Sequence, residues 1–310
     1  MSIFLIILFS IIVLLTIFSF FLLSYTLSRA YFDRHQEKQA YDEDGIILSS
    51  AEEMQELIKT AKEVSITSYD NLKLAGYFRK AKTPAHNYII AMHGYHGKPA
   101  EMAHFAYHFQ DKHNFNILVP TQRAHGKSEG KYITMGFKEK FDLKNWIDFI
   151  IKEDKEANIL LFGISMGAAT VTQVSNLKLP SNVKAIIADC GYTSCFEEFK
   201  YELKHLFHLP SFPLLNFTSF ICRLRLGFFF QSANSLKAVK ESKIPTLFIH
   251  GDKDTFVPFR MQEELFSQAN CPKEKCIIKD ATHAMSESKD PQTYWKVADA
   301  FTLKYFICNK

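Results

Sequence analysis

The chain has 310 residues, enough for one large α/β domain or two small ones. Apolar residues make up 47% of it and the formal net charge is only +4, so the composition is that of a globular protein and excludes a disordered chain. Such a small positive charge also gives no indication of nucleic-acid binding.

Residues 3–27 contain no charged side chain and consist mainly of Ile, Leu, Phe and Val. A helix of this length can cross a hydrocarbon layer of about 30 Å, so we expect a single-pass membrane anchor over residues 1–28. The alternative is a cleaved signal peptide. However, no basic segment precedes the run, no A-x-A site follows it, and the run exceeds the roughly 7 to 15 residues of a signal core. A buried core helix would instead show a polar stripe.

The charges beside this run bear on its orientation. Arg29, Arg34 and Lys38 follow it and no Lys or Arg precedes it, so the positive-inside rule favours a cytoplasmic location for the rest of the chain. Asp33 and Glu37 lie among these three basic residues.

Residues 29–62 are polar and charged, and we expect a juxtamembrane spacer with a helix near residues 50–62 that begins at Ser-Ala-Glu-Glu. Residues 63–310 have the pattern of one α/β domain. At its start, residues 64–69 and 74–79 alternate apolar and polar side chains around Asp70 and Asn71, which predicts an antiparallel hairpin.

Short runs rich in Ile, Leu, Val and Phe then recur, mostly separated by amphipathic stretches of helical length. These runs are residues 87–92, 115–119, 158–162, 183–188, 246–249 and 276–278. Such alternation predicts a mainly parallel central sheet with helices on both faces. Because ligands of such sheets bind beyond the carboxyl ends of the strands, we expect the loops after these runs to lie together and to hold the functional residues.

About fifty residues separate two of these runs, after residue 190 and before residue 246. They are rich in Phe, and Pro210 and Pro213 interrupt their helical pattern. A connection of this length in a compact domain is usually functional, so we expect a helical, aromatic-rich lid insertion over about residues 192–235. A helical hairpin that packs its own aromatic side chains is the plainer alternative.

A candidate nucleophile lies at Ser165. The apolar residues 159–162 are followed by Gly-Ile-Ser-Met-Gly and then by small residues, which predicts a strand, a sharp turn and a helix. Gly163 and Gly167 leave room where the strand and helix approach closely, so the hydroxyl of Ser165 can stand at the top of the sheet.

An acid and a base follow the serine in the order Ser, Asp, His. Asp254 lies in the loop after residues 246–250, and His283 follows the last predicted strand. A serine hydroxyl becomes nucleophilic when a neutral imidazole takes its proton, and a carboxylate holds that imidazole in the required tautomer. Asp252 is the alternative acid, but a residue so close to the strand more often caps the turn.

Acyl transfer also needs donors for a developing oxyanion. We expect backbone N–H groups from Met166, the residue after the serine, and from Tyr95 in the loop after residues 87–92.

No metal or cofactor site is expected. His93, His96 and His125 have neither a neighbouring carboxylate nor the i, i+4 spacing of a metal site on a helix. Residues 123–128 lack the spacing of a phosphate-binding loop, so we expect a structured turn there. The six cysteines form no C-x-x-C pair, and buried free thiols are the simplest interpretation.

From about residue 64 onward the sequence resembles the α/β-hydrolase superfamily, and within it bacterial membrane-anchored hydrolases related to prolyl-oligopeptidase-like and acyl-ester hydrolases. The matching segments, in order, are HGYHGKP, QRAHGKSEG, GISMGAAT, ADCGYTS, IHGDKDTFVP and ATHAMS. The resemblance implies the α/β-hydrolase fold and a catalytic set of Ser165, His283 and Asp254. The family commonly has Asp where Thr121 stands; that residue braces a loop, so the difference bears on local rigidity.

The sequence therefore favours a membrane-anchored serine hydrolase that cleaves carboxylic esters through an acyl-enzyme. The expected substrate is a small-molecule or lipid-like acyl ester, the expected partner is the membrane, and no nucleic acid is expected. A serine peptidase or thioesterase of the same fold is the first alternative. A catalytically silent, membrane-tethered binding protein is the second.

Overall fold

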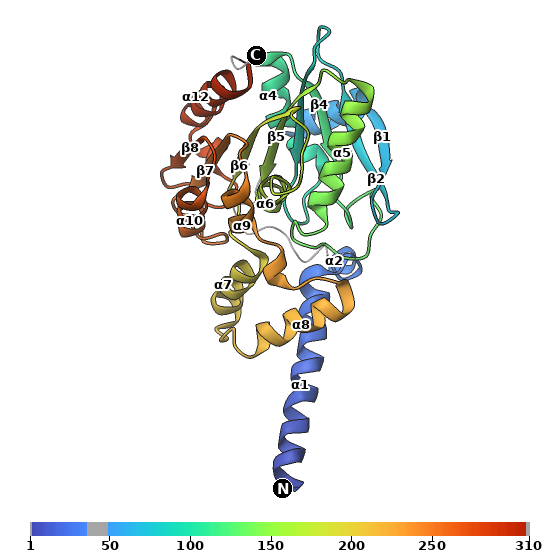
Figure 1. Ribbon diagram of the computed structural model, residues 1–310, viewed down its shortest axis with the longest axis vertical. Coiled ribbons are helices and arrows are strands. Elements are labelled where there is room, and N and C mark those ends of the chain that lie inside the picture. Colours follow the sequence, from blue (N-terminus) through green and yellow to red (C-terminus); the bar gives the residue numbers. More distant parts are fainter. Residues whose placement is uncertain (1, 36–48, 308–310) are drawn as a thin grey trace.

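The computed structural model describes residues 2–35 and 49–307. An eight-stranded sheet forms the centre of the main body, with helices packed around it (Figure 1). At one end of this body lies a smaller group of helices, and the N-terminal helix α1 (Ser2–Leu27) projects from there away from the sheet.

The strands lie in the order β1-β2-β4-β3-β5-β6-β7-β8 across the sheet. Their bounds are β1 (Lys62–Thr67), β2 (Lys73–Arg79), β3 (Asn87–Met92), β4 (Asn116–Pro120), β5 (Asn158–Ile164), β6 (Val183–Asp189), β7 (Thr246–Gly251) and β8 (Lys273–Ile278). β1 pairs antiparallel with β2, and β2 with β4, whereas the pairs from β4 to β8 are parallel. The predicted hairpin and the predicted mainly parallel sheet are both confirmed.

The central strand β5 is apolar throughout because it is covered on both faces. Successive side chains of a strand point to opposite faces. Leu160 and Phe162 belong to the core that includes residues of α3 (Ala51–Thr60), α4 (Ala103–His113) and α12 (Pro291–Thr302). Leu161 belongs to the core on the other face, with residues of α5 (Glu139–Glu153) and α6 (Met166–Val174). Each fully buried side chain of this kind contributes roughly 1.5–3 kcal/mol.

The other helices are short or lie at the edges. They are α2 (Arg29–His35), η1 (Pro99–Met102), α9 (Ser235–Glu241), α10 (Arg260–Gln268), α11 (Ser286–Lys289) and the π-helical turn η3 (Leu303–Ile307). α3 begins where the sequence predicts: Ser50 Oγ accepts from Glu53 N at 3.2 Å, and a Glu53 carboxylate oxygen accepts from Ser50 N at 2.8 Å.

The long connection after β6 folds as α7 (Cys195–Phe207), α8 (Leu214–Leu226) and the short η2 (Phe230–Ser232). We call residues 192–235 the cap. Figure 1 shows α7 and α8 beyond the end of the sheet, at the end of the body from which α1 projects. Buried side chains of the cap, including Phe228 and Phe230, form one cluster with Leu27 of α1 and Met166 of α6. The cap therefore joins α1 to the end of the sheet where β5 meets α6.

Candidate active site

Ser165 lies at a strained turn between β5 and α6. Its backbone has φ 56° and ψ −118°, a conformation that non-glycine residues rarely adopt. The flanking glycines permit the turn: a Cβ on Gly163 would lie 2.4 Å from the carbonyl carbon of Gly167, and a Cβ on Gly167 would lie 2.0 Å from the carbonyl oxygen of Met92. The Ser165 N–H donates to the Asp189 carbonyl at 2.9 Å, which fixes the turn to β6.

His283 stands between Ser165 and Asp254. Its Nε2 lies 2.9 Å from Ser165 Oγ, and its Nδ1 lies 2.7 Å from Asp254 Oδ2. An ionised carboxylate can only accept, so Nδ1 carries the proton and Nε2 is left to accept from the serine hydroxyl. Three residues that lie far apart in the sequence thus form a continuous chain of hydrogen bonds. Such a chain can activate a hydroxyl as a nucleophile.

The carboxylate of Asp254 is held by several donors. Asp254 Oδ1 accepts from the N–H groups of Phe256 and Val257 at 2.9 and 2.8 Å. Burial opposes ionisation, but the charge of His283 and hydrogen bonds from His250 and His283 outweigh it, so the pKa of Asp254 lies well below its usual range. The rival Asp252 instead accepts from the Asp280 N–H at 2.6 Å, in the turn that follows β8.

His250 contacts Asp254 as well, and sequence reasoning assigned it no role. Its Nε2 lies 3.0 Å from Asp254 Oδ2 and 2.9 Å from the carbonyl of Val257, so this nitrogen carries a proton. Its Nδ1 is buried without a hydrogen-bond partner among the described residues. The available signal was its place at the end of an apolar strand, four residues before Asp254. His250 therefore holds the same carboxylate oxygen, Asp254 Oδ2, that contacts Nδ1 of His283.

The loop after β3 lies against the serine. A Cβ on Gly94 would lie 3.6 Å from the Cβ of Ser165. Neither the Tyr95 N–H nor the Met166 N–H donates to an acceptor within the described part of the chain. Both predicted donors are therefore next to the serine in sequence or in space and lack a protein partner, the condition required of groups that stabilise an oxyanion.

The imidazoles of His93 and His125 brace this loop. His93 Nε2 accepts from the Gln122 N–H at 3.1 Å, and His125 Nε2 accepts from the His96 N–H at 3.1 Å. Burial, followed by the proximity of His125, lowers the pKa of His93 to about 3, so its imidazole is neutral. Because these two ring nitrogens already accept from backbone N–H groups, His93 and His125 have a structural role.

One set of potential metal ligands coincides with the hydrogen-bonded chain itself. Among the described residues, ligand atoms of Cys190, Asp254 and His283 lie within 4.8 Å of one another. Burial raises the pKa of the Cys190 thiol well above its usual value, which disfavours the thiolate that a metal would need. The described cysteines, residues 190, 195, 222, 271 and 276, are free, and Cys308 lies outside the described residues.

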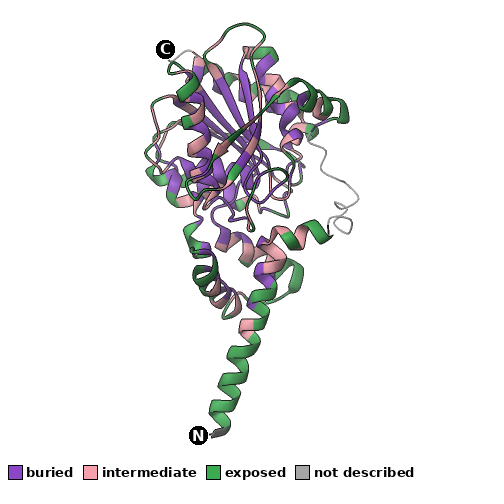
Figure 2. Ribbon diagram, turned by 90° about the vertical axis from the view of Figure 1, so that its right-hand side faces the viewer, coloured by how far each residue is buried: buried purple, intermediate pink, exposed green. Residues whose placement is uncertain are grey.

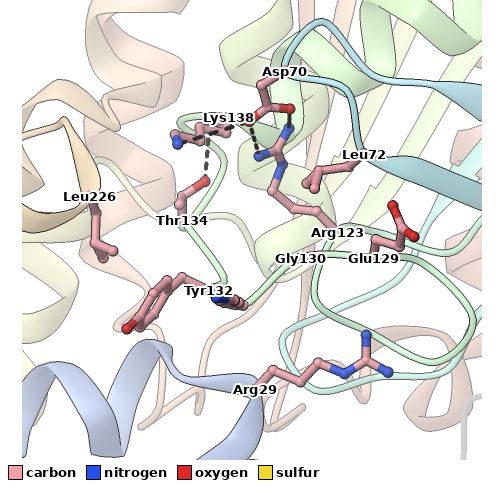
Figure 3. Close-up of a pocket in the computed structure, with 11 residues that line it drawn as sticks. Arg29, Asp70, Leu72, Arg123, Glu129, Gly130, Tyr132, Thr134, Lys138 and Leu226 are labelled. Carbon is pink, nitrogen blue, oxygen red and sulfur yellow. Dashed lines mark hydrogen bonds and ion pairs between the residues drawn. The ribbon is translucent and has the colours of Figure 1, made fainter.

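The segment that contains Thr121 is rigid in spite of the departure from the family pattern. Arg123 is buried between two carboxylates, with Nε 2.6 Å from Asp142 and a terminal nitrogen 3.0 Å from Asp70. Figure 3 shows the contact with Asp70. Ser128 Oγ donates to the Thr121 carbonyl at 2.6 Å and accepts from the Ala75 N–H at 2.9 Å. These bonds form the structured turn that residues 123–128 predict.

A pocket of about 550 Å³ lies beside this turn, and Figure 3 shows the residues that line it. It is lined by Arg29 of α2, by the β1–β2 turn, by the segment between β4 and α5 that includes Tyr132, and by Leu226 at the end of α8. None of its lining residues belongs to the Ser165, His283 and Asp254 group. This pocket is therefore separate from the candidate active site.

Helix α1 and its extension contact the loop that lies against Ser165. The Tyr95 hydroxyl donates to the Thr26 carbonyl, and the Phe32 ring stacks on the His96 ring with centroids 3.7 Å apart. Arg29 donates to the carbonyls of Gly126 and Ser128, both at 2.6 Å. The last turns of α1 are consequently part of the body of the protein.

Comparisons with known proteins agree with this fold. The family described as "Serine aminopeptidase, S33" matches residues 83–196. An esterase of Pyrococcus furiosus has a similar structure, with a TM-score of 0.62, 25% identity, and coverage of 79% of this chain and 91% of that one. The strand order, the strained serine turn and these matches agree on the fold. The chain has the α/β-hydrolase fold.

Two further proteins are similar to this hydrolase. The protein YqkD of Bacillus subtilis is 29% identical over 269 residues, which cover 85% of this hydrolase and 88% of YqkD. An acylaminoacyl peptidase of Pyrococcus horikoshii shares the fold, with a TM-score of 0.60 and 18% identity, and the match covers 81% of the hydrolase but only 42% of the peptidase.

Proposed function

We propose that this hydrolase is a membrane-anchored serine esterase that cleaves carboxylic acyl esters. The observation that carries the proposal is the hydrogen-bonded chain from Ser165 Oγ through His283 to Asp254, with distances of 2.9 and 2.7 Å. Ser165 is the nucleophile, His283 is the base and later the acid, and Asp254 orients the imidazole and stabilises its protonated form.

The reaction proceeds in two halves. Ser165 Oγ attacks the acyl carbon while its proton passes to His283 Nε2, and the Tyr95 and Met166 N–H groups stabilise the oxyanion. The intermediate collapses when the alcohol leaves with the proton from His283, which yields the acyl-enzyme. Water then attacks the acyl carbon, gives a proton to His283, and releases the carboxylic acid and free Ser165 by the same steps.

An ester with an apolar acyl group suits the surroundings of Ser165. Met166 and the cap side chains around it form an apolar cluster, which includes Tyr192, Leu203 and Phe228. Ligand sites are lined mainly by such side chains. The similarity to the Pyrococcus furiosus esterase supports the same substrate class.

The features of α1 fit a membrane anchor. From residue 3 to residue 14 every side chain is exposed, and the helix is apolar on all sides. The hydroxyls of Ser10 and Thr16 donate to the carbonyls of Ile6 and Ile12 at 2.9 and 2.7 Å, which satisfies them without water. Cleavage as a signal peptide would remove the buried Leu23 and Leu27, so the structure favours a retained anchor. Arg29 and Arg34 favour a cytoplasmic active site.

The test is covalent labelling of the full-length protein with a fluorophosphonate probe, together with hydrolysis of a short p-nitrophenyl ester. Ser165→Ala should abolish both and leave the fold intact. Ser175→Ala is the matched control, because Ser175 lies at the other end of α6 and its hydroxyl donates to the Thr172 carbonyl at 2.6 Å. Ester hydrolysis that persists in Ser165→Ala would refute the proposal, and a wild-type protein that takes no label would favour the membrane-tethered binding protein.

Cleavage of a peptide from its N-terminus is the second candidate, and one observation favours it. Glu198 of α7 is buried, and neither carboxylate oxygen has a hydrogen-bond partner among the described residues. Burial, followed by the charges of Glu202 and Asp254, raises its pKa well above the usual value. A substrate ammonium group would give this carboxyl a partner. A panel of ester, thioester and peptide substrates separates the three activities, and Glu198→Gln should impair peptide cleavage alone.

A further inference from the structure

The cap carries a concentration of exposed apolar side chains. Outside α1, the described residues include twelve exposed large apolar side chains, and seven of these lie in residues 206–229. Phe212 and Leu224 are the most exposed of the seven, at 74% and 69%. The other five are scattered singly over the body. Exposed apolar side chains that gather in one part of a surface usually mark an interaction site.

The helices that carry these side chains contact the C-terminal part of α1, residues 19–27, which we call the base of α1. Ser19 Oγ of α1 lies 2.9 Å from Thr218 Oγ1 of α8, and both side chains are buried. The ring of Tyr25 contacts the ring of Phe207, at the end of α7, with centroids 6.4 Å apart. Figure 2 shows the exposed helix α1 leaving the molecule at the same end as the cap. The apolar surface of α1 therefore continues onto the cap.

The length of α1 indicates how deeply the cap lies in a bilayer that α1 crosses. The first residue of α1 that the body buries is Ser19, so the free apolar segment comprises residues 3–18. Sixteen residues at about 1.5 Å each extend over only ~24 Å. The hydrocarbon layer of a bilayer is about 30 Å thick, and tilting the helix only shortens its projection. The remaining ~6 Å of hydrocarbon corresponds to residues 19–22, which lie level with α8.

We propose that the cap lies in the leaflet that surrounds the base of α1, and that the acyl substrate of the proposed esterase reaches Ser165 from this leaflet. The occupant of the apolar surface is thus the lipid acyl region itself. Exposed basic residues stand at the C-terminal end of α8, where they can meet the headgroups. The Arg225 guanidinium lies 5.3 Å from the Phe20 ring centroid and donates to the Tyr132 hydroxyl at 2.8 Å.

The interior of the cap connects this surface to the serine. Leu23 of α1, Leu215 of α8, Leu203 of α7 and Met166 belong to one buried apolar cluster, and Met166 follows Ser165 directly. Ser165 itself is only 6% exposed. An acyl chain that enters between α1 and the cap helices replaces apolar contacts with apolar contacts and need not cross water. This route rests on the proposed function, whereas the position of the cap in the leaflet does not.

The position of the cap in the leaflet is tested by the quenching of tryptophan fluorescence with lipids that are brominated on their acyl chains. The full-length Phe212→Trp variant is reconstituted in vesicles with or without brominated lipid, and its emission is compared with that of the parent, which has two tryptophans. The additional tryptophan should lose about half of its emission or more, because it lies among acyl chains. Leu303→Trp is the control, since Leu303 is 44% exposed on η3, which packs with α12 away from the cap. Its additional emission should be unaffected.

Equal quenching at positions 212 and 303, or no quenching at position 212, overturns the proposal. A second copy of the chain that covered the surface would also leave position 212 unquenched. The double variant with Ser165→Ala should quench as Phe212→Trp does, so failure of the esterase chemistry cannot be mistaken for failure of the membrane position. The route is tested by Leu224→Asp, which should lower the ratio of activity on a vesicle-embedded long-chain ester to activity on a soluble ester by about tenfold. Ile58→Asp, at an exposed apolar residue of α3, should leave that ratio unchanged, and an unchanged ratio in Leu224→Asp would overturn the route.

Discussion

Leu27 tests whether the end of α1 is part of the folded body. Leu27 is fully buried in the cluster that includes Met166 and Phe228, and its carbonyl accepts from the Ile133 N–H at 2.9 Å. Leu14, thirteen residues nearer the N-terminus on the same helix, is 66% exposed. Leu27→Ala removes buried methyl groups and leaves a cavity, which costs about 2–5 kcal/mol, whereas Leu14→Ala removes no contact with the body.

For a domain of about 250 residues, each kcal/mol shifts Tm by roughly 2–4 °C. Leu27→Ala should therefore lower Tm by roughly 4–20 °C, and Leu14→Ala should leave it unchanged. Both variants are measured as full chains in detergent by differential scanning fluorimetry, with the fraction that still reacts with the fluorophosphonate probe as a second reading. Equal Tm values for the two variants would refute the conclusion that α1 is integrated into the body. The same contacts predict that a chain lacking residues 1–28 is unstable.

Three other predictions follow from the site. Asp254→Asn should lower kcat for a soluble ester by about 10⁴-fold, because the imidazole of His283 loses its orienting carboxylate. The kcat of Asp252→Asn should stay within about tenfold of wild type. Steady-state kinetics measure both variants, and equal losses of kcat would contradict the assignment of Asp254. Gly167→Ala should prevent folding, because its Cβ would lie 2.0 Å from the Met92 carbonyl oxygen; soluble, probe-reactive protein would contradict this. Burial lowers the pKa of His93 to about 3, so below pH 6.5 the unfolded chain binds a proton that the folded chain does not. The free energy of unfolding therefore falls as the pH falls from 6.5 toward 3, by about 2 kcal/mol between pH 6.5 and 5. In chemical denaturation, the free energy of unfolding of His93→Gln should depend less steeply on pH than that of the wild type.

The sequence predicts much of the fold because the pattern of each element is local. An apolar strand such as β5 is covered on both faces, and the two glycines around Ser165 permit a turn that other residues would obstruct. The capping box at Ser50 is likewise a relation between residues three positions apart. Each of these features depends on near neighbours in the chain, so the order of residues is enough to predict it.

Contacts between distant segments could not be predicted in the same way. Asp252 and Asp254 lie in the same loop, and only the folded position of His283, 29 residues later, shows that Asp254 is its partner. His250 is an ordinary strand residue in the sequence and contacts Asp254 only because the loop after β7 folds back over it.

The sequence by itself determined the sheet, the serine turn and an apolar N-terminal helix, because periodicity and local sterics specify such elements. Only the tertiary structure decided that this helix ends inside the body, with Leu27 buried and the Thr26 carbonyl bonded to Tyr95, and that the cap presents Phe212 and Leu224 beside it. The sequence shows that these side chains are apolar. Whether an apolar side chain packs inside the body or faces outward depends on which distant segments fold against it, and that is a property of the assembled chain.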